Sequence, residues 1–496
     1  MNEVAVRAGS SEVGPILAAQ DTLDLYASAT GVERDAVHPK RVGALATDLC
    51  DDVFDVPAET AAYLQDIGER AQGDNAEAAV ALSALKTFSL MVGPNSKLWE
   101  EVSDLLTDIP IIDEFVQQGR KKINTNNTEI DKILQGEQNG EVKQHYWQVL
   151  LGGLAMRSTV EVNNELLTKV NIQSPLNRAL ELLDNLRRPS QNDAAVFRDA
   201  YDAKSFYATL SEALRHDAVS MSLSSLANIL CLQKMGMEDA LKDAVEILKP
   251  YQDRETVRST FEEMFKELLG GYGPTDHVIT DTAEHNIILG TSSFKRGVQE
   301  PSLRAVWRLK SLGSLAAKIF KKGYAPDVFG VTIVCNGRKQ LEDVFSSLII
   351  NIDASERAHF ADLPAGEEPI YIRGNKGYIE KIEKQLKQMK INHPLESKPN
   401  DRKKEFRVAK VMIEFDGKPM EIMVQTESDR RRSRIGRWAS HVGYKLGPQG
   451  AAGLKKIYKR LDDFGAGTIE PSKVRGEQLR ALVEAAEPLP QDWRKL

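Results

Sequence analysis

The chain has 496 residues, too many for a single hydrophobic core, so its length predicts two or three domains. Hydrophobic residues make up 42% and charged residues 28% of it, as in ordinary globular proteins. No apolar run approaches the roughly 18 residues of a bilayer-spanning helix, and residues 1–20 lack the pattern of a secretory signal. Cys50, Cys231 and Cys335 form no CxxC pair. We therefore expect a cytoplasmic protein with reduced thiols, no zinc site and no membrane partner.

The net charge of −7 hides a division between two parts of the chain. Residues 301–460 contain 32 Lys and Arg against 18 Asp and Glu, a net charge of +14, so the remainder carries −21. A basic module within an acidic chain suggests an anionic ligand for that module. Opposite charges would equally help two domains to dock.

The first half of the chain predicts helices. Residues 1–55 indicate a weakly ordered N-terminal segment with helical fragments. Residues 56–270 predict a helical domain of unknown role, because apolar residues recur there three and four positions apart. The polar stretch 119–144 interrupts this pattern as a loop or linker, and the breaker cluster GGYGPTD at 270–276 predicts a domain boundary.

Beyond this boundary the pattern changes to α+β with a mixed or antiparallel sheet. Residues 303–321 predict a helix, and FGVTIVC at 329–335 predicts a short buried strand. A second apolar strand is possible in SSLIINI at 346–352, and a charged helix follows at 378–390.

The last part of this half predicts a hairpin and two helices. FRVAKVMIEF at 406–415 and KPMEIMVQT at 418–426 indicate strands joined by a tight Asp-Gly turn. The basic stretch 429–444 predicts a helix that closes the unit, and a tail helix is expected within 465–496.

The stretch RLKSLGSLAAK places four polar residues at spacings that suit one anion: Arg308, Lys310, Ser314 and Lys318. Residues three or four apart are neighbours on a helix. Arginine offers a planar fork to phosphate oxygens, lysine a compact charge and serine a small donor. Basic helices are common, so the cluster alone fits a solvated surface equally well.

Two carboxylates are candidate metal ligands. Asp327 follows a proline just before the strand at 329–335, where it could hold a Mg²⁺ ion that also binds phosphates. Strand alternation places Glu421 on one face with Met423 and Gln425. Each carboxylate, taken alone, fits equally a turn aspartate or a surface glutamate.

Read in order, the chain contains RLKSLGSLAAK, DVFGVTI, MEIMVQT and ASHVGYK. This set resembles the RelA/SpoT synthetase domain, whose members read RxKxxxSxxxK, DxxGxRI, E(I/V)Q(I/V)RT and AxHxxYK. Those enzymes make an alarmone of the bacterial stress response by moving a pyrophosphoryl group from ATP to the 3′-hydroxyl of a guanine nucleotide. The resemblance implies a nucleotidyltransferase-like mixed sheet flanked by helices over residues 285–460, after a mainly α-helical N-terminal half.

The resemblance also implies roles for particular residues. It assigns ATP binding to Arg308, Lys310, Ser314 and Lys318. Asp327 and Glu421 would bind Mg²⁺, and Glu421 would also help to deprotonate the attacking hydroxyl. His441 and Lys445 match the closing motif on the acceptor side. Tyr378 is one alternative for the family's loop tyrosine, which stacks on the acceptor guanine.

The chain departs from the family mainly on the acceptor side. Thr332 and Gln425 stand where the family has arginines, and the loop tyrosine is missing at its usual spacing. The remaining His-Asp pair, His216-Asp217, is interpreted as a chance pair rather than a hydrolase motif.

Three hypotheses follow. The first is an alarmone synthetase that uses ATP and a guanine nucleotide. The second is a toxin-like pyrophosphokinase acting on the 3′ end of tRNA, because a polyanionic acceptor would exploit the basic module. The third is a non-catalytic nucleotide-binding or regulatory protein, which the lost arginines suggest. The partner of the helical half is not predicted by any of them.

Overall fold

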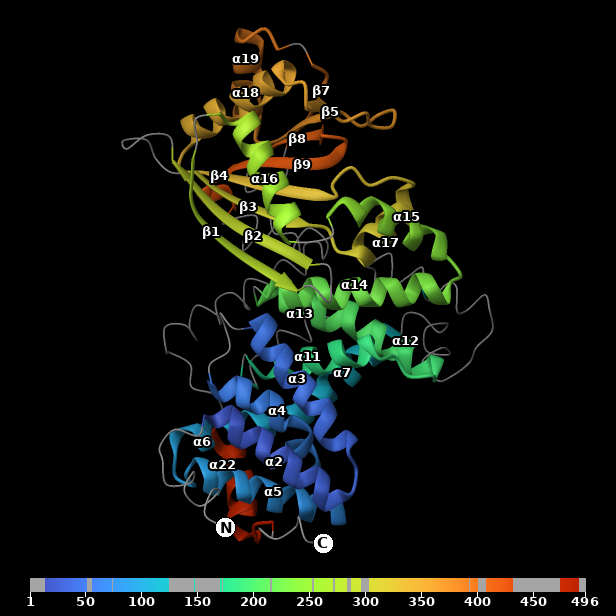
Figure 1. Ribbon diagram of the computed structural model, residues 1–496, viewed down its shortest axis with the longest axis vertical. Helices are drawn as coiled ribbons and strands as arrows, with labels where there is room; N and C mark the ends of the chain where they lie inside the picture. The colour runs from blue at the N-terminus through green and yellow to red at the C-terminus, as the bar shows by residue number, and fades with distance from the viewer. Residues whose placement is uncertain are drawn as a thin grey trace. The chain divides into compact units, whose positions relative to one another are not determined.

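The structure is a computed structural model that combines helices with one mixed, open β-sheet (Figure 1). It describes residues 14–50, 56–124, 147, 170–270, 273–282, 287–295, 303–399, 407–430 and 473–489, apart from residues 74, 172, 215, 252, 253 and 392. The chain divides into two compact units. Unit 1 comprises Met1–Leu223 and Lys456–Leu496, and unit 2 comprises Ser224–Lys455. No helix in the described ranges is long and apolar enough to cross a membrane.

The described elements of unit 1 are helices. They are α2 (Pro15–Thr30), α3 (Arg34–Cys50), α4 (Val56–Arg70), α5 (Ala76–Val92), α6 (Lys97–Thr107), α7 (Ile109–Asn124), α11 (Ser174–Arg187), α12 (Asp193–Asp202), the π-helix η2 (Ala203–Tyr207), α13 (Ala208–Ala213) and α22 (Lys473–Ala485). Helices α2–α6 and α22 share a core in which Phe88 and Trp99 meet edge to face at 5.9 Å. Helix α14 (Asp217–Lys234) runs across the division between the units.

Two ends of the chain are more firmly built into unit 1 than the sequence indicated. Residues 1–55 were expected to be weakly ordered, but α2 and α3 occupy residues 15–50, and Leu23 and Tyr26 are fully buried. The tail helix within 465–496 is present as α22. It packs on α6, and Arg480 donates to Asp104 at 2.9 Å. Amphipathic helices are ordered by their partners, which a local pattern does not show.

Unit 2 carries the sheet. Its elements are α15 (Glu238–Leu248), the 3₁₀ helix η3 (Lys249–Tyr251), α16 (Arg254–Leu268), β1 (Gly273–Thr282), β2 (Ile287–Lys295), β3 (Leu303–Leu309), α17 (Leu312–Lys322), β4 (Phe329–Cys335), α18 (Arg338–Ala354), β5 (Ala358–Phe360), β6 (Ile370–Gly374), α19 (Lys376–Gln388), β7 (Leu395–Pro399), β8 (Val408–Phe415) and β9 (Lys418–Thr426). The strand order is β1-β2-β3-β4-β9-β8-β6-β7, with β5 beside β8. The β4–β9 and β6–β7 pairs are parallel and the other pairs antiparallel.

One face of the central strands is buried under helices. Side chains alternate along β3, so Trp307 is buried while its neighbour Arg308 is exposed. Helix α16 lies over the buried face (Figure 1), where Phe261 stacks on Trp307 at 5.3 Å and contacts Phe329 at 6.5 Å. The opposite face of β3, β4 and β9 presents Arg308 and Glu421.

Two sequence predictions in this half are confirmed. The strand at 329–335 is β4, and the Asp-Gly hairpin joins β8 to β9. Asp416 and Gly417 have φ angles of 49° and 71°, the left-handed pair that a tight two-residue hairpin turn requires.

Two other predictions are wrong. The single helix at 303–321 is instead strand β3 followed by α17, with a break at Lys310 and Ser311. The strand at 346–352 belongs to helix α18, whose buried residues include Leu341, Phe345, Leu348 and Ile352 at helical spacing. The apolar run at 346–352 is too short for its spacing to distinguish a helix from a strand.

The predicted domain boundary at 270–276 coincides with the start of β1 at Gly273. The compact units nevertheless divide earlier, between Leu223 and Ser224, so α15 and α16 belong with the sheet.

Candidate functional site

The candidate site begins with a carboxylate held between two lysines. Asp327 lies two residues before β4, and its Oδ2 accepts from Lys310 Nζ at 2.8 Å. Its Oδ1 accepts from Lys318 Nζ, on α17, at 2.6 Å. The side chains of Asp327 and Lys310 are each 16% exposed, and that of Lys318 is 25% exposed. The first two sequence motifs therefore meet in a partly buried cluster that solvent still reaches.

The backbone around this cluster is fixed by local contacts. Lys310 N–H donates to Val328 O at 2.8 Å, which joins the end of β3 to the residue after Asp327. Ser311, the residue before α17, donates to Ser314 Oγ at 3.0 Å. Gly313 N–H donates to Ser225 Oγ at 3.0 Å, and an added Cβ at Gly313 would lie 1.9 Å from Ser225 O. Only glycine allows α17 to sit this close to α14.

The charges of the cluster stabilise one another. Burial would raise the pKa of Asp327, but the charges of Lys310 and Lys318 outweigh this effect and hold that pKa well below its usual range. Burial lowers the pKa of Lys310; Asp327 opposes the change, while Arg308 and Lys318 add to it. Two lysines thus hold one carboxylate, and Arg308 is close enough to influence Lys310, an arrangement suited to a second, competing anion.

Arg308 and Glu421 lie on the same face of the sheet, one on each side of β4. Arg308 is paired in register with Gly330, and Gly330 with Glu421. The glycine between them has no side chain, and Arg308 Cγ lies 3.6 Å from where a Cβ at Gly330 would lie. Glu421 Oε1 is paired with Lys410 Nζ at 3.0 Å.

The two candidate metal ligands therefore have different lysine partners. Glu421, on β9, is paired in register with Gly330 of the parallel strand β4. Gly330 comes three residues after Asp327 in the chain. At about 3.3 Å per residue, these positions differ by about 10 Å along the strand direction. The expectation that both carboxylates hold one ion stays a prediction.

The predicted ATP-binding residues are brought to one place, although not on one helix. Arg308 is on strand β3, Lys310 follows it, and Ser314 and Lys318 are on α17. The strand-to-helix turn at Lys310 and Ser311 brings Lys310 and Lys318 to Asp327, while Ser314 contacts Ser311.

The acceptor-side predictions fare differently. Tyr378 is in the first turn of α19, where it is 1% exposed and therefore unable to stack on a base in this conformation. The guanidinium groups of Arg338 and Arg407 lie 5.5 Å and 6.0 Å from its ring centre, beside a cavity of about 480 Å³. His441 and Lys445 lie outside the described residues. A glycine followed by a tyrosine occurs both in loops and in the first turn of a helix, as Gly377 and Tyr378 do in α19. The sequence therefore did not distinguish the two possibilities.

The two departures from the family occupy structural positions. Thr332 is in the middle of β4 on the face that carries Glu421. Gln425 is 3% exposed, and its side-chain amide donates to Arg407 O at 3.2 Å. Gln425 therefore ties the start of β8 to β9 and does not face a ligand as an arginine would.

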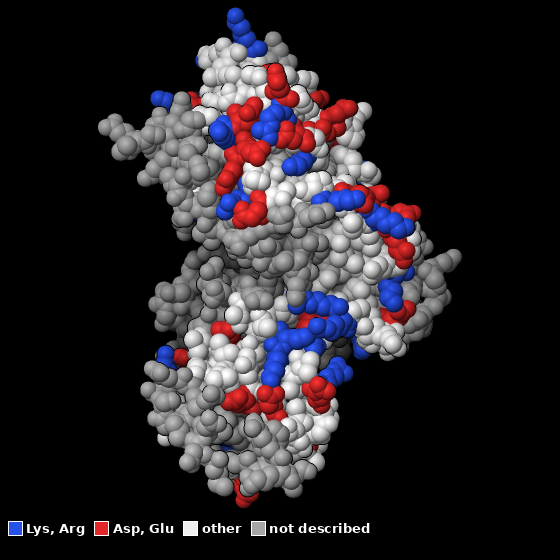
Figure 2. Space-filling view, in the orientation of Figure 1, with Lys and Arg blue, Asp and Glu red and all other residues white. Residues whose placement is uncertain are grey.

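Charge on the visible face of unit 2 is mixed. Lys and Arg are interleaved with Asp and Glu around α16 (Figure 2), and Arg357 pairs there with Glu263 and Asp416. Arg258 likewise pairs with Glu255 at 2.8 Å. The described residues of this face therefore carry charges of both signs.

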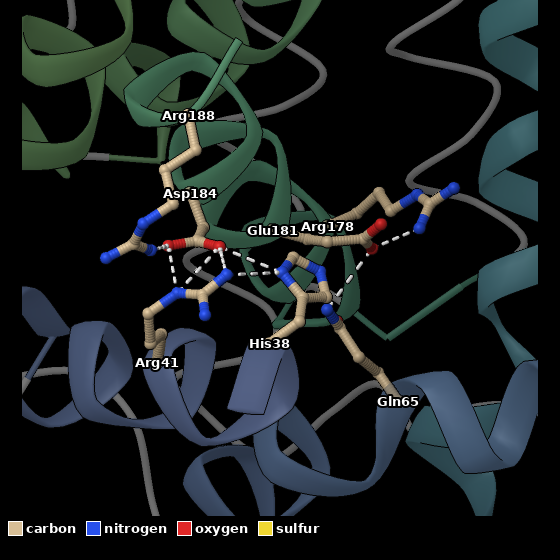
Figure 3. Close-up of polar contacts among 7 residues, drawn as sticks. All are labelled: His38, Arg41, Gln65, Arg178, Glu181, Asp184 and Arg188. Atoms are coloured by element: carbon tan, nitrogen blue, oxygen red, sulfur yellow. Dashed lines mark hydrogen bonds and ion pairs between the residues drawn. The ribbon is translucent and has the colours of Figure 1, made fainter. Parts of the chain in front are cut away.

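Unit 1 contains a polar cluster that the sequence did not predict (Figure 3). Asp184, 1% exposed on α11, accepts from Arg41 at 2.8 Å and from Arg188 at 2.8 Å, and it lies 2.8 Å from His38 Nδ1. Glu181, one turn earlier, accepts from Gln65 at 3.2 Å and from Arg178. His38 and Asp184 are 146 residues apart in the chain, so no local spacing joins them.

A search with models of known protein families finds no match to the chain, and a search of curated protein sequences finds none either.

Proposed function

We propose that unit 2 is a divergent, nucleotidyltransferase-like domain of the RelA/SpoT type, which transfers a pyrophosphoryl group from ATP to the 3′-hydroxyl of a guanine nucleotide with Mg²⁺. The observation that carries the proposal is the bridge from Lys310 through Asp327 to Lys318, just before the interior strand β4 of a mixed sheet. The motif order of the resemblance supports it independently.

The donor side of the proposal rests on charge. Pyrophosphoryl transfer requires positioning and neutralisation of charge on the phosphate oxygens more than it requires covalent chemistry by the protein. Lys310, Lys318 and Arg308 would provide that charge. Phosphate oxygens would take the place of Asp327 as partners of the lysines, and the partly buried setting would strengthen these bonds.

The two carboxylates fit a hard cation in chemistry, since Mg²⁺ prefers oxygen ligands and is commonly held by one or two carboxylates together with phosphates. Asp327, released from its lysines, would provide such a ligand. When bound, Mg²⁺ would neutralise charge developing on the transferred group. Glu421, 18% exposed and paired with Lys410, would accept the proton of the attacking hydroxyl.

A non-catalytic nucleotide-binding protein is a second candidate, and a specific observation favours it. Asp327 and Glu421 are both paired with lysines, and Tyr378 is buried, so the described residues provide no tyrosine for stacking at the place the resemblance suggested. The same cationic cluster would bind ATP without transferring anything from it.

The test is incubation of the full chain with β,γ-labelled ATP and Mg²⁺, with GDP, GTP or bulk tRNA in separate reactions. We expect label to appear on GDP or GTP. Label on tRNA alone would show that the acceptor is a polynucleotide and not a guanine nucleotide. ATP binding without a labelled product in any reaction would support the non-catalytic candidate and contradict the proposed transfer.

A further inference from the structure

We propose that unit 1 has a site for a divalent transition-metal ion, formed by His38 of α3, Asp66 of α4 and Glu181 of α11. One ligand atom from each of these side chains lies within 4.8 Å of the other two. Three side chains from three different helices thus converge on one point. That convergence is independent of the site proposed in unit 2.

The atoms that face this point are free of other partners within the described ranges. His38 uses Nδ1 for Asp184, which leaves Nε2 available. Both donors to Glu181, the side chains of Gln65 and Arg178, bind its Oε2 and leave Oε1 available. No described residue donates a hydrogen bond to Asp66. Three ligand atoms that have no protein donor among the described residues and lie in one place suit the binding of one cation.

Asp184 orients the histidine as a metal site requires. Metal-bound histidines almost always place their second ring nitrogen on a carboxylate or carbonyl, which fixes the tautomer and the ring plane. Asp184 is 2.8 Å from His38 Nδ1, and Arg41 and Arg188 hold its carboxylate in place. Figure 3 shows the other edge of the imidazole turned toward the side of Glu181.

The electrostatics of the cluster favour a cation. Burial raises the pKa of Asp66 and of Glu181; Arg178 opposes the change in both, and Asp66 adds to it in Glu181. Asp66 and Glu181 also help to raise the pKa of His38 against the opposing effect of burial. A cation bound among them would offset the repulsion between the two carboxylates, and protons would compete with it for the same groups.

The ligand set indicates the class of metal. One imidazole and two carboxylates suit Mn²⁺, Fe²⁺, Co²⁺ or Zn²⁺ better than Mg²⁺ or Ca²⁺, which take oxygen ligands. Three protein ligands leave coordination positions open, as in catalytic rather than structural zinc sites. Glu181 also lines a cavity of about 200 Å³ beside Arg178 and Tyr207.

The test is a Mn²⁺ titration of the nucleotide-free full chain, followed by the loss of the electron paramagnetic resonance signal of free Mn²⁺. The Asp327→Asn/Glu421→Gln background removes both candidate ligands of unit 2, so failure of the proposed transferase would not affect the result. We expect a single tight Mn²⁺ and a higher melting temperature when Mn²⁺ is present. Asp66→Asn, which removes no hydrogen bond among the described residues, should weaken binding tenfold or more.

Further variants separate ligands from structure. Glu181→Gln should weaken binding as Asp66→Asn does, and Asp184→Asn should weaken it by about 10–100-fold because the histidine loses its orienting partner. The matched control is His393→Gln in unit 2, where His393 pairs with Asp353 at 2.6 Å on the surface. It should leave binding unchanged. Absence of tight Mn²⁺ binding by the parent, or unchanged binding in folded Asp66→Asn and Glu181→Gln, would overturn the proposal.

Discussion

Lys318 reaches Oδ1 of Asp327 at 2.6 Å, although the loop that follows its own helix lies between them in the chain. Lys310 occupies the other oxygen at 2.8 Å, so the two motifs form one electrostatic unit. A phosphate that binds the lysines competes with Asp327, and this competition determines how each substitution should behave.

Removing either lysine should chiefly weaken ATP binding. A hydrogen bond to a charged group contributes about 1.5–3 kcal/mol, and about 1.4 kcal/mol corresponds to a tenfold change in affinity. Lys310→Ala and Lys318→Met should therefore each raise the Kd for ATP about tenfold or more, as measured by isothermal titration calorimetry. Lys387→Ala, on the exposed side of α19, is the control and should leave the Kd unchanged. Equal Kd values for all three variants would mean that ATP binds elsewhere.

The contact between α17 and α14 should not tolerate a methyl group at Gly313. A Cβ at Gly313 would lie 1.9 Å from Ser225 O and 2.7 Å from Ser225 C, so the backbone itself would have to move. Gly313→Ala should cost about 1–3 kcal/mol of unfolding free energy, measured in urea. Gly337→Ala is the matched control, because its φ is −159° and no atom lies within 4 Å of the added Cβ. A stable Gly313→Ala variant would contradict this packing.

Local patterns predicted the parts of the fold whose causes are local. The β-branched run of β4 and the left-handed Asp416-Gly417 turn are recognisable from a few residues. The turn between Arg308 and Ser314 was missed, because the helical spacing of RLKSLGSLAAK continues across the end of β3. Strand pairing with β2 and β4 overrides local propensity there.

The sequence was least informative where distant segments meet. The contact of Asp184 with His38 joins helices α11 and α3, and neither residue stands in a motif. The three-residue spacing of Glu181 and Asp184 places them on one face of α11, which is a local signal of a polar helix face. Tyr378 shows the converse, since a suggestive residue type proved to be buried packing.

His216 should make the fold sensitive to acid. It is 5% exposed, and burial lowers its pKa from 6.5 to about 4. Between these pH values the unfolded chain binds a proton that the folded chain does not, so stability should fall as pH drops from 6.5 to about 4. The full loss is about 3 kcal/mol at about 1.4 kcal/mol per pKa unit.

Urea unfolding at pH 7 and at pH 4.5 measures this effect. His216→Gln cannot take up the proton in either state, so its stability should change less between the two pH values than that of the parent chain. An identical loss in both proteins would show that other groups cause the acid sensitivity.

The rate of pyrophosphoryl transfer by Asp327→Asn, compared with the parent chain and with Lys387→Ala, tests the central claim most directly. The account predicts labelled guanine nucleotide from the parent and the control. Loss of a metal ligand removes several kcal/mol of transition-state stabilisation, so Asp327→Asn should be slower by on the order of a hundredfold or more, with its circular dichroism spectrum preserved. A folded Asp327→Asn chain that transfers the label at the parental rate would contradict the account.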